Sequence, residues 1–332
     1  MQDSAPASFL KSEVTMGKYI LKKLGQAIIV LLLITFLSFL IMELIPGDAV
    51  SYMLGFEATQ EAIDTMRAQL NLDKPFAVRY FMWLGGMLRG DFGTSAFYHD
   101  SVSQLLSTRI AITFKMGLAA LILSTVLGIL LGIISAVRRG KFADNLISFL
   151  ANIGISMPSF WLGILMMIVF AVKLKWFPVQ GYTAPEKDMA MHLKQMVMPV
   201  IVTAVGALSS MVRQTRSAVL ETINQDYVRT AREKGLNESK ILGKHVLRNA
   251  LVPVITLLGM QVRVLFGGVV IVENIFAVPG MGSLLVNSVY NRDVMVVQGC
   301  MVVMGLVVVV ANFLVDISYG LIDPRVRDAK EN

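Results

Sequence analysis

The chain has 332 residues, of which 55% are hydrophobic, and its mean hydropathy is +0.66. A soluble domain of this length could not bury so much apolar surface, so the composition predicts a polytopic membrane protein. Three histidines and one cysteine leave little material for a metal site and exclude a disulfide within the chain. The net charge of +7 would suggest nucleic-acid binding in a soluble protein, but basic loops at one membrane face explain it better.

Residues 1–15 are polar and small and lack the apolar run of a signal peptide or a span, so we expect a disordered extension. A misassigned start codon, with Met16 as the natural start, is the alternative. The first apolar run, residues 24–42, follows Lys18, Lys22 and Lys23 and is long enough to cross a bilayer. A cleaved signal sequence is the alternative. The run is long for a signal core, however, and no small-residue cleavage site follows it.

Residues 46–109 form a mixed polar segment in which we expect two short helices and then a turn at GDFGTS (90–95). Five further apolar runs follow, so we predict six transmembrane helices in all. These five runs cover residues 112–137, 146–172, 195–212, 250–272 and 294–322. Pro199 and Gly206 interrupt the fourth span, where neighbouring helices can satisfy the backbone groups that a proline frees.

Basic residues are concentrated on one side of these spans. With the N-terminus inside, the inner segments hold 18 Lys and Arg and the outer segments hold 10. We therefore predict an all-α polytopic membrane protein with both termini in the cytoplasm, and nucleic-acid binding is not needed to explain the charge. Its expected parts are a disordered extension (1–15), a first transmembrane helix with an extracytoplasmic helical segment (16–109), a core of five transmembrane helices (110–327) and a cytoplasmic tail (328–332).

The predicted inner loop 213–249 is the only long charged segment in the C-terminal two-thirds of the chain. Within it, residues 225–234 are expected to form a short helix that Gly235 ends, and Asn237 can cap the next helix. A helix of this length spans about 15 Å and is marginal alone in water, so it needs a surface to lie against. The loop predicts a grip for a separate protein; a solvated basic loop near anionic lipid is the alternative.

One face of this short helix is predicted to be apolar. Tyr227, Val228 and Ala231 fall together at helical spacing, whereas Arg229 and Arg232 point elsewhere. We expect the apolar face to be the one that rests on a surface.

Several motifs resemble those of one transporter family. Arg229-Thr230-Ala231, three further residues and then Gly235 resemble the "EAA…G" coupling motif of ABC-transporter permeases. Arg229 in place of Glu, followed by HVLRNALVPV, is similar to the dipeptide, oligopeptide and nickel permeases. The other matching stretches, in order, are YILKKLGQAI, IPGD, GDFGTS, MPSFWLG, VVIVENIFAVPGMG and NFLVDISYGLIDPRVR.

The resemblance implies a type I ABC importer permease in the cell membrane that forms half of a pathway for peptides, or for nickel and metal chelates. It implies four partners: a second homologous permease, two cytoplasmic ATPases and an extracytoplasmic substrate-binding protein that segment 46–109 would receive. Arg229, Thr230, Ala231 and Gly235 would couple this chain to an ATPase. ATP and Mg would bind to the ATPases, and this chain would hold no cofactor.

The fifth span and the residues after it supply candidates for the translocation pathway. Arg263 lies in mid-span, where a charge is expensive and faces a partner or a watery cavity. It could meet a substrate carboxylate, or it could pair with Glu273 or with another subunit. Pro279, Gly280 and Gly282 require an irregular turn that could fold back toward the pore, with a plain outer loop as the alternative.

Other chemistries find little support in the sequence. No G-x-x-x-x-G-K-[ST] loop occurs, so this chain cannot be the ATPase, and the scattered His99, His192 and His245 suggest no metal site. A secondary transporter driven by an ion gradient would need mid-membrane acids and an internal repeat. Asp316 instead lies near the cytoplasmic end, where we expect a pairing role, and Glu43 can reach the outer surface. A membrane-embedded enzyme would need a catalytic constellation, which is also missing.

Overall fold

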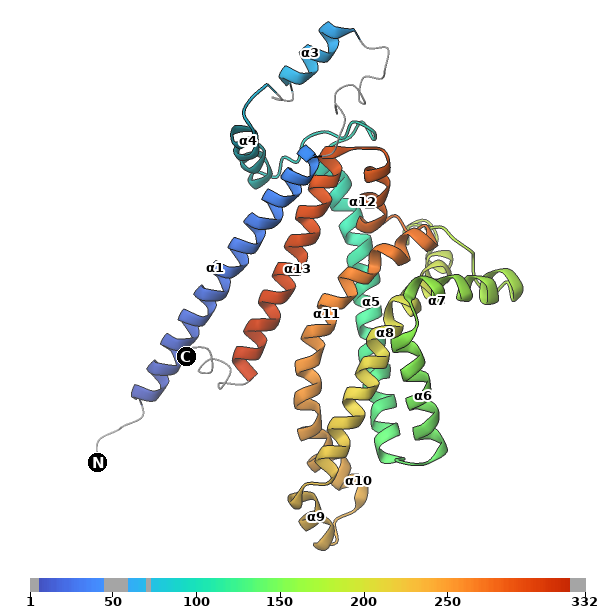
Figure 1. The fold of residues 1–332 in the computed structure, drawn as a ribbon. Helices are drawn as coiled ribbons and strands as arrows, with labels where there is room; N and C mark the ends of the chain where they lie inside the picture. The colour runs from blue at the N-terminus through green and yellow to red at the C-terminus, as the bar shows by residue number, and fades with distance from the viewer. Residues whose placement is uncertain (1–5, 45–58, 70–72, 323–332) are drawn as a thin grey trace. The chain divides into compact units, whose positions relative to one another are not determined.

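The computed structural model describes residues 6–44, 59–69 and 73–322 (Figure 1). Within these ranges, the side chains of 6–16, 42, 62, 63, 66, 69, 318–322 and most of 252–267 fall outside the description. The IPGD stretch and the expected tail lie outside the described residues. The described elements are α1 (Pro6–Leu44), α3 (Gln60–Gln69), α4 (Phe76–Leu88), α5 (Val102–Val137), α6 (Phe142–Ser156), α7 (Ser159–Met166), η1 (Met167–Lys173), α8 (Met189–Ile223), α9 (Asp226–Glu233), α10 (Glu238–Lys240), η2 (Ile241–Leu247), α11 (Arg248–Phe276), α12 (Met281–Tyr290) and α13 (Val294–Ile322).

Four of the described helices are long and apolar enough to cross a membrane by themselves. They are α5, α8, Gly17–Ile41 of α1 and Val294–Ile317 of α13. The count rises to six if each of two bent helix pairs is taken as one span, which agrees with the six predicted spans. The predicted fourth span lies in α8, which continues through Pro199 without a break.

The predicted third span, 146–172, is not one straight helix. The chain bends by 110° between α6 and the pair α7 and η1. Met157, at the bend, has extended backbone angles, because the ring of Pro158 disfavours a helical conformation in the residue before it. The apolar run is continuous in the sequence, so hydropathy alone did not reveal this break.

The helix at the N-terminus is longer than expected. We predicted a disordered extension over residues 1–15, but α1 begins at Pro6 and is continuous to Leu44. Proline suits the first helical position because the N–H that it lacks has no partner within the helix. Ala, Leu, Lys and Glu, which favour helices, then extend the long apolar helix backwards by about ten residues.

The chain divides into two compact units. Unit 1 contains residues 1–111 and 281–332, and unit 2 contains residues 112–280. The last helix therefore groups with the first one, whereas the sequence division placed 110–327 together. The reason is a lengthwise contact between α1 and α13, in which Ile34 of α1 lies against Gly305 of α13 (Figure 1). A glycine at this position lets two membrane helices approach closely.

Polar contacts hold both ends of unit 1. At one end, Lys23 of α1 pairs with Asp316 of α13 at 2.6 Å, which confirms the predicted pairing role of Asp316. At the other, Gly90 and Gly93 adopt positive φ in the GDFGTS stretch, confirming the predicted turn. The hydroxyl of Ser95 after this turn donates to buried Asp293 at 2.5 Å.

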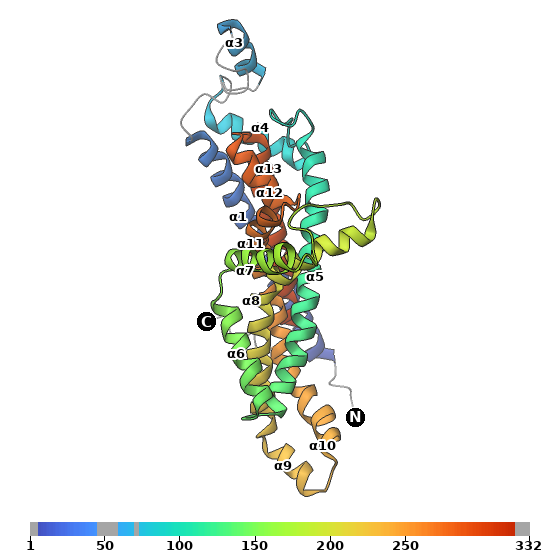
Figure 2. The ribbon, with the colours of Figure 1, turned by 90° about the vertical axis from the view of Figure 1, so that its right-hand side faces the viewer.

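Unit 2 is built around α8, which packs against α6 and α11. Small residues again allow close packing: a Cβ on Gly132 of α5 would lie 2.6 Å from Thr215 of α8, and one on Gly154 of α6 would lie 2.2 Å from Ser209. Past the end of α8, the chain continues into α9 and α10, at the lower end of unit 2 in Figures 1 and 2.

Candidate functional site

The short helix expected within the charged loop is present as α9. It covers Asp226–Glu233, and Gly235 after it has a φ of +73°, so the predicted helix at 225–234 and its glycine stop are confirmed. The N–H of Leu236 returns to the carbonyl of Ala231, which satisfies one of the last carbonyls of the helix. The side chain of Asn237 accepts a hydrogen bond from the N–H of Ser239, which confirms the predicted cap.

The surface on which α9 rests belongs to the same chain. Val228 and Ala231 are buried in a cluster with Val219 of α8 and with Ile241 and Val246 of η2. This packing supplies the support that a helix of eight residues cannot provide for itself.

Tyr227 departs from the expected apolar face. Its side chain is 42% exposed, and its hydroxyl accepts a hydrogen bond from Asn249 at 2.9 Å. The predicted face is therefore buried at two of its three positions, while the tyrosine links α9 to the start of α11.

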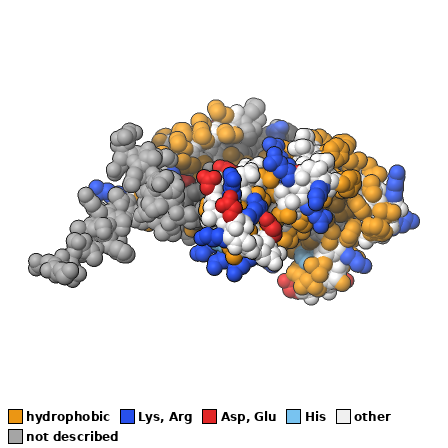
Figure 3. Space-filling view, turned by 90° about the horizontal axis from the view of Figure 1, so that it is seen from below, with side chains coloured by type: hydrophobic (Ala, Val, Ile, Leu, Met, Phe, Trp, Pro, Cys, Tyr) orange, Lys and Arg blue, Asp and Glu red, His pale blue; other side chains and the backbone are white. Residues whose placement is uncertain are grey.

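Away from this cluster, the surface of α9 is charged and open. Arg229 pairs with Glu233 at 3.2 Å and Thr230 bonds to the carbonyl of Asp226, and these side chains are exposed. Charged side chains of both signs are gathered on the face seen from below in Figure 3. Of the four predicted coupling residues, Arg229 and Thr230 thus present side chains to the outside, Ala231 faces the interior, and Gly235 forms the turn.

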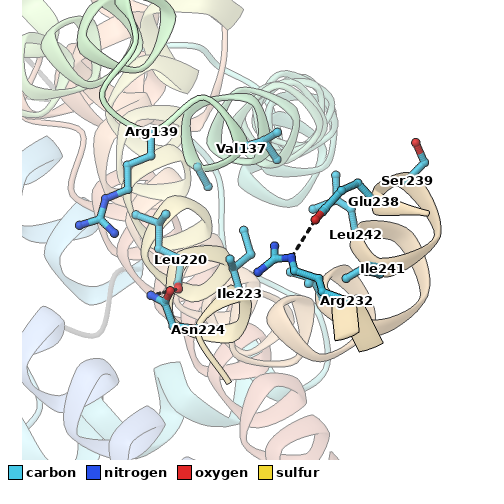
Figure 4. A pocket seen from close by; sticks show the side chains of 12 residues that line it. Val137, Arg139, Leu220, Ile223, Asn224, Arg232, Glu238, Ser239, Ile241 and Leu242 are labelled. Carbon is cyan, nitrogen blue, oxygen red and sulfur yellow. Dashed lines mark hydrogen bonds and ion pairs between the residues drawn. The ribbon is translucent and has the colours of Figure 1, made fainter. Parts of the chain in front are cut away.

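A pocket of about 380 Å³ lies beside α9 and α10 (Figure 4). The C-terminal ends of α5 and α8 form one wall, and α10 with η2 forms the other. An ion pair of 2.7 Å joins Arg232 to Glu238 among its lining residues. The lining residues are Ala136, Val137, Arg139, Leu220, Ile223, Asn224, Arg232, Glu238, Ser239, Ile241, Leu242 and Val246.

A buried polar network ties together the ends of α5, α6 and α8 nearest α9. Arg216 of α8 binds Asp144 of α6 through two hydrogen bonds, Nε to Oδ1 at 2.8 Å and Nη2 to Oδ2 at 2.9 Å. Ser135 of α5 donates to Oδ1 at 2.5 Å, and the N–H of Gly140 donates to Oδ2 at 2.9 Å. The carboxylate of Asp144, on α6, therefore accepts hydrogen bonds from two other helices and one loop.

A second buried carboxylate stands where α11 ends. Glu273 is fully buried, and Thr113 of α5 donates to its Oε1 at 2.5 Å. Ala277, the residue after α11, has a φ of +52°, so the predicted irregular turn is present. A Cβ on Gly280 would lie 2.0 Å from Oε1 of Glu273, so the carboxylate occupies the space that only glycine leaves open.

The other predicted pathway residues are not all brought together. Pro279 lies half-buried in the same turn as Glu273 and Gly280, whereas Gly282 is a buried residue of α12 in unit 1. Arg263 belongs to α11, and its side chain lies outside the described residues.

The family model of the binding-protein-dependent transport system inner membrane component matches residues 128–328. The model of the N-terminal part of these membrane components matches residues 16–116. The chain belongs to this family. It is therefore a multi-pass permease subunit of the cell membrane and not itself an enzyme.

Relatives match the permease over most of its length. A Brucella abortus (strain 2308) protein named as a peptide transport system permease is 41% identical, covering 94% of this chain and 99% of the relative. The oligopeptide transport system permease protein AppB of Bacillus subtilis (strain 168) is 38% identical with the same coverage. A chain of the methionine ABC transporter MetNI, in an inward-facing conformation, is similar in fold, with a TM-score of 0.51 and 22% identity over 68% of this chain and 96% of that one.

The hydrogen-bond network around Asp144 was not predicted from the sequence of the permease. Asp144 is the only acidic residue in the predicted inner loop 138–145, where three basic residues precede it. Local spacing would pair it with one of those neighbours. Its actual partner, Arg216, is 72 residues away, and only the packing of α6 on α8 brings the two together.

Replacing Gly280 with alanine should destabilise the permease by about 1–3 kcal/mol, the usual cost of overpacking a filled interior. The carboxylate of Glu273 would have to move from a fully buried position to make room. The measurement is the melting temperature of the purified permease in detergent. Gly206→Ala in α8 is the matched control, because a Cβ there meets no described atom within 4 Å. Equal melting temperatures of the two variants would show that the turn can rearrange around the added methyl group at little cost in stability.

Proposed function

We propose that this permease forms half of a pathway that imports peptides at the expense of ATP hydrolysed by partner subunits. The observation that carries the proposal is α9, a short charged helix fixed to the end of a long membrane helix. Relatives that match the chain over nearly their whole length are named as peptide permeases, which favours peptides as the cargo. Nickel or metal chelates are the alternative cargo.

In this proposal, α9 is the contact with a cytoplasmic ATPase. Arg229 and Thr230 offer exposed polar groups, Ala231 and its neighbour Val228 hold the helix to its own chain, and Gly235 provides the sharp turn. Movement of the ATPase would reach the membrane through α8, because Val219 near the end of α8 packs in the cluster that supports α9. The basic excess of the predicted inner loops supports a cytoplasmic position for this end.

The pathway itself would be shared with a second homologous permease. Arg263, Glu273, Pro279, Gly280 and Gly282 remain the candidates for its lining. For Glu273, complete burial and the bond from Thr113 favour a role in holding the turn over direct contact with cargo. An extracytoplasmic binding protein would deliver the cargo, and two ATPases, which bind ATP and Mg, would complete the complex.

Reconstitution of the complete complex in proteoliposomes tests this function. We expect uptake of labelled dipeptides or longer peptides to require ATP and the loaded binding protein, and to continue when ionophores collapse ion gradients. Uptake that persists without ATP and stops with ionophores would instead support a secondary transporter. Nickel chelates, assayed in parallel, decide the cargo. The isolated binding protein should gain about 2.7 kcal/mol of stability at 100 times the Kd of its true ligand.

A further inference from the structure

Helix α4 of unit 1 is apolar on both of its faces. Its sequence, FAVRYFMWLGGML, contains a single charged residue, Arg79, which pairs with Glu43 at the end of α1. A helix that is apolar all round is stable in a protein interior or in a membrane, and not when one side faces bulk water. The question is therefore what each face of α4 contacts.

One face packs against α1 through aromatic rings. Tyr80 meets Phe36 and Phe39 edge to face, each at a centroid distance of 5.7 Å. Phe76 lies 5.3 Å and Trp83 5.5 Å from Phe39. These contacts hold α4 against α1. In Figures 1 and 2, α4 lies beside the last turns of α1.

The opposite face is left open by the part of the chain that the structure describes. Val78, Phe81, Met82 and Leu88 recur there at helical spacing, and Phe81 and Leu88 are 67% and 78% exposed. Arg79 is not part of this face, because its side chain is mostly buried in the pair with Glu43. The exposed stripe therefore consists of large apolar side chains, and the ammonium group of Lys74, before the helix, lies 3.6 Å from the sulfur of Met82.

The contacts with α1 also set the depth of α4. Phe36 and Phe39 lie inside the apolar run 24–42 of α1, three to six residues before its last residue, which the charged Glu43 follows. At 1.5 Å per residue, α4 touches α1 about 5–9 Å before the end of that run. At this level α1 also exposes apolar side chains of its own, Phe36, Leu37 and Ile41, and Phe36 contacts the rings of Phe76 and Tyr80 in α4.

We propose that α4 lies along the outer surface of the bilayer, with Val78, Phe81, Met82 and Leu88 against lipid acyl chains. Its exposed apolar stripe lies at a level where α1 also exposes apolar side chains, and Tyr80 and Trp83 are of the residue types that gather at membrane interfaces. This role rests on the insertion of α1 in the membrane and not on the cargo or the coupling helix. It also removes α4 from the part of segment 46–109 that can receive a binding protein.

Spin labels in the complete complex, held in lipid nanodiscs, test this placement. Cysteines are introduced singly as Phe81→Cys and Leu88→Cys. Leu33→Cys, exposed within the span of α1, serves as the lipid control, and Ala68→Cys, exposed on the polar helix α3, serves as the water control. Unmodified protein, labelled in parallel, measures the background from the buried Cys300.

Collision with oxygen, which concentrates in lipid, is compared with collision with a water-soluble nickel chelate. We expect labels at 81 and 88 to show a ratio of oxygen to nickel accessibility that is severalfold above the ratio at 68 and close to the ratio at 33. A nickel accessibility equal to that at 68 would place this face in water. Low accessibility to both reagents would mean that a partner protein covers it. Either result overturns the proposal.

Discussion

Replacing Arg216 with leucine should lower the melting temperature of the permease far more than the loss of any surface ion pair. The change leaves the carboxylate of Asp144, 4% exposed, with hydroxyl and amide donors but without its cation. Orphaning a buried charge costs about 3–5 kcal/mol. Because the side chain of Arg216 is itself 30% exposed, we expect the lower end of that range. Thermal unfolding of the purified permease, followed in detergent, is the measurement.

Two further variants test the cause of this loss. Arg232→Leu removes an ion pair of similar length, 2.7 Å, whose side chains are 42% and 70% exposed, so it should cost less than about 1 kcal/mol. Adding Asp144→Asn to Arg216→Leu should restore part of the stability, since a neutral amide needs no cation. If Arg232→Leu destabilises as strongly as Arg216→Leu, burial is not what gives the Asp144 network its importance.

Replacing Gly235 with tryptophan should abolish association with the ATPase while the permease still inserts and folds. A Cβ at this position meets no described atom within 4 Å, so the large side chain would project outward into the space proposed for the partner. Within the chain, the cost comes from the positive φ and is about 1–2 kcal/mol. Co-purification of the ATPase and hydrolysis stimulated by the loaded binding protein are the measurements.

Gly235→Asn and Gly235→Ala separate the effect of the backbone conformation from the effect of side-chain size. Asparagine tolerates the left-handed conformation and should preserve coupling better than alanine, which is smaller but disfavours it. If Gly235→Ala abolishes association with the ATPase as completely as Gly235→Trp, the association depends on the conformation of the turn and not on the size of the side chain at 235. Normal hydrolysis in the tryptophan variant would rule out this turn as part of the ATPase contact.

The sequence predicted well those features that depend on residues close together in the chain. The helix at 226–233 and its stop follow from a local apolar pattern and a glycine, and the spans follow from long apolar runs. Long-range partners were not predictable in this way. Arg216 and Asp144 meet because α6 packs on α8, and Thr113 of α5 meets Glu273 of α11 although 160 residues separate them.

Some local features were also missed, for identifiable reasons. The bend at Met157 has a sequence signal in Pro158, but the apolar residues on both sides concealed it. Ala277 takes a left-handed conformation that residues with a Cβ seldom adopt, so its sequence gives no warning. Tyr227 leaves the apolar face because its hydroxyl finds Asn249, a residue of another helix.

The packing of α9 onto its own chain has a consequence for how fast and how tightly a partner can bind. Ordering a free segment costs roughly 1–2 kcal/mol per residue in backbone entropy, which a partner would have to offset if α9 folded only on contact. With Val228 and Ala231 already buried, this entropy is lost when the permease itself folds. Binding energy from a partner is then available for displacing the helix, and the pre-organised surface can associate without a folding step.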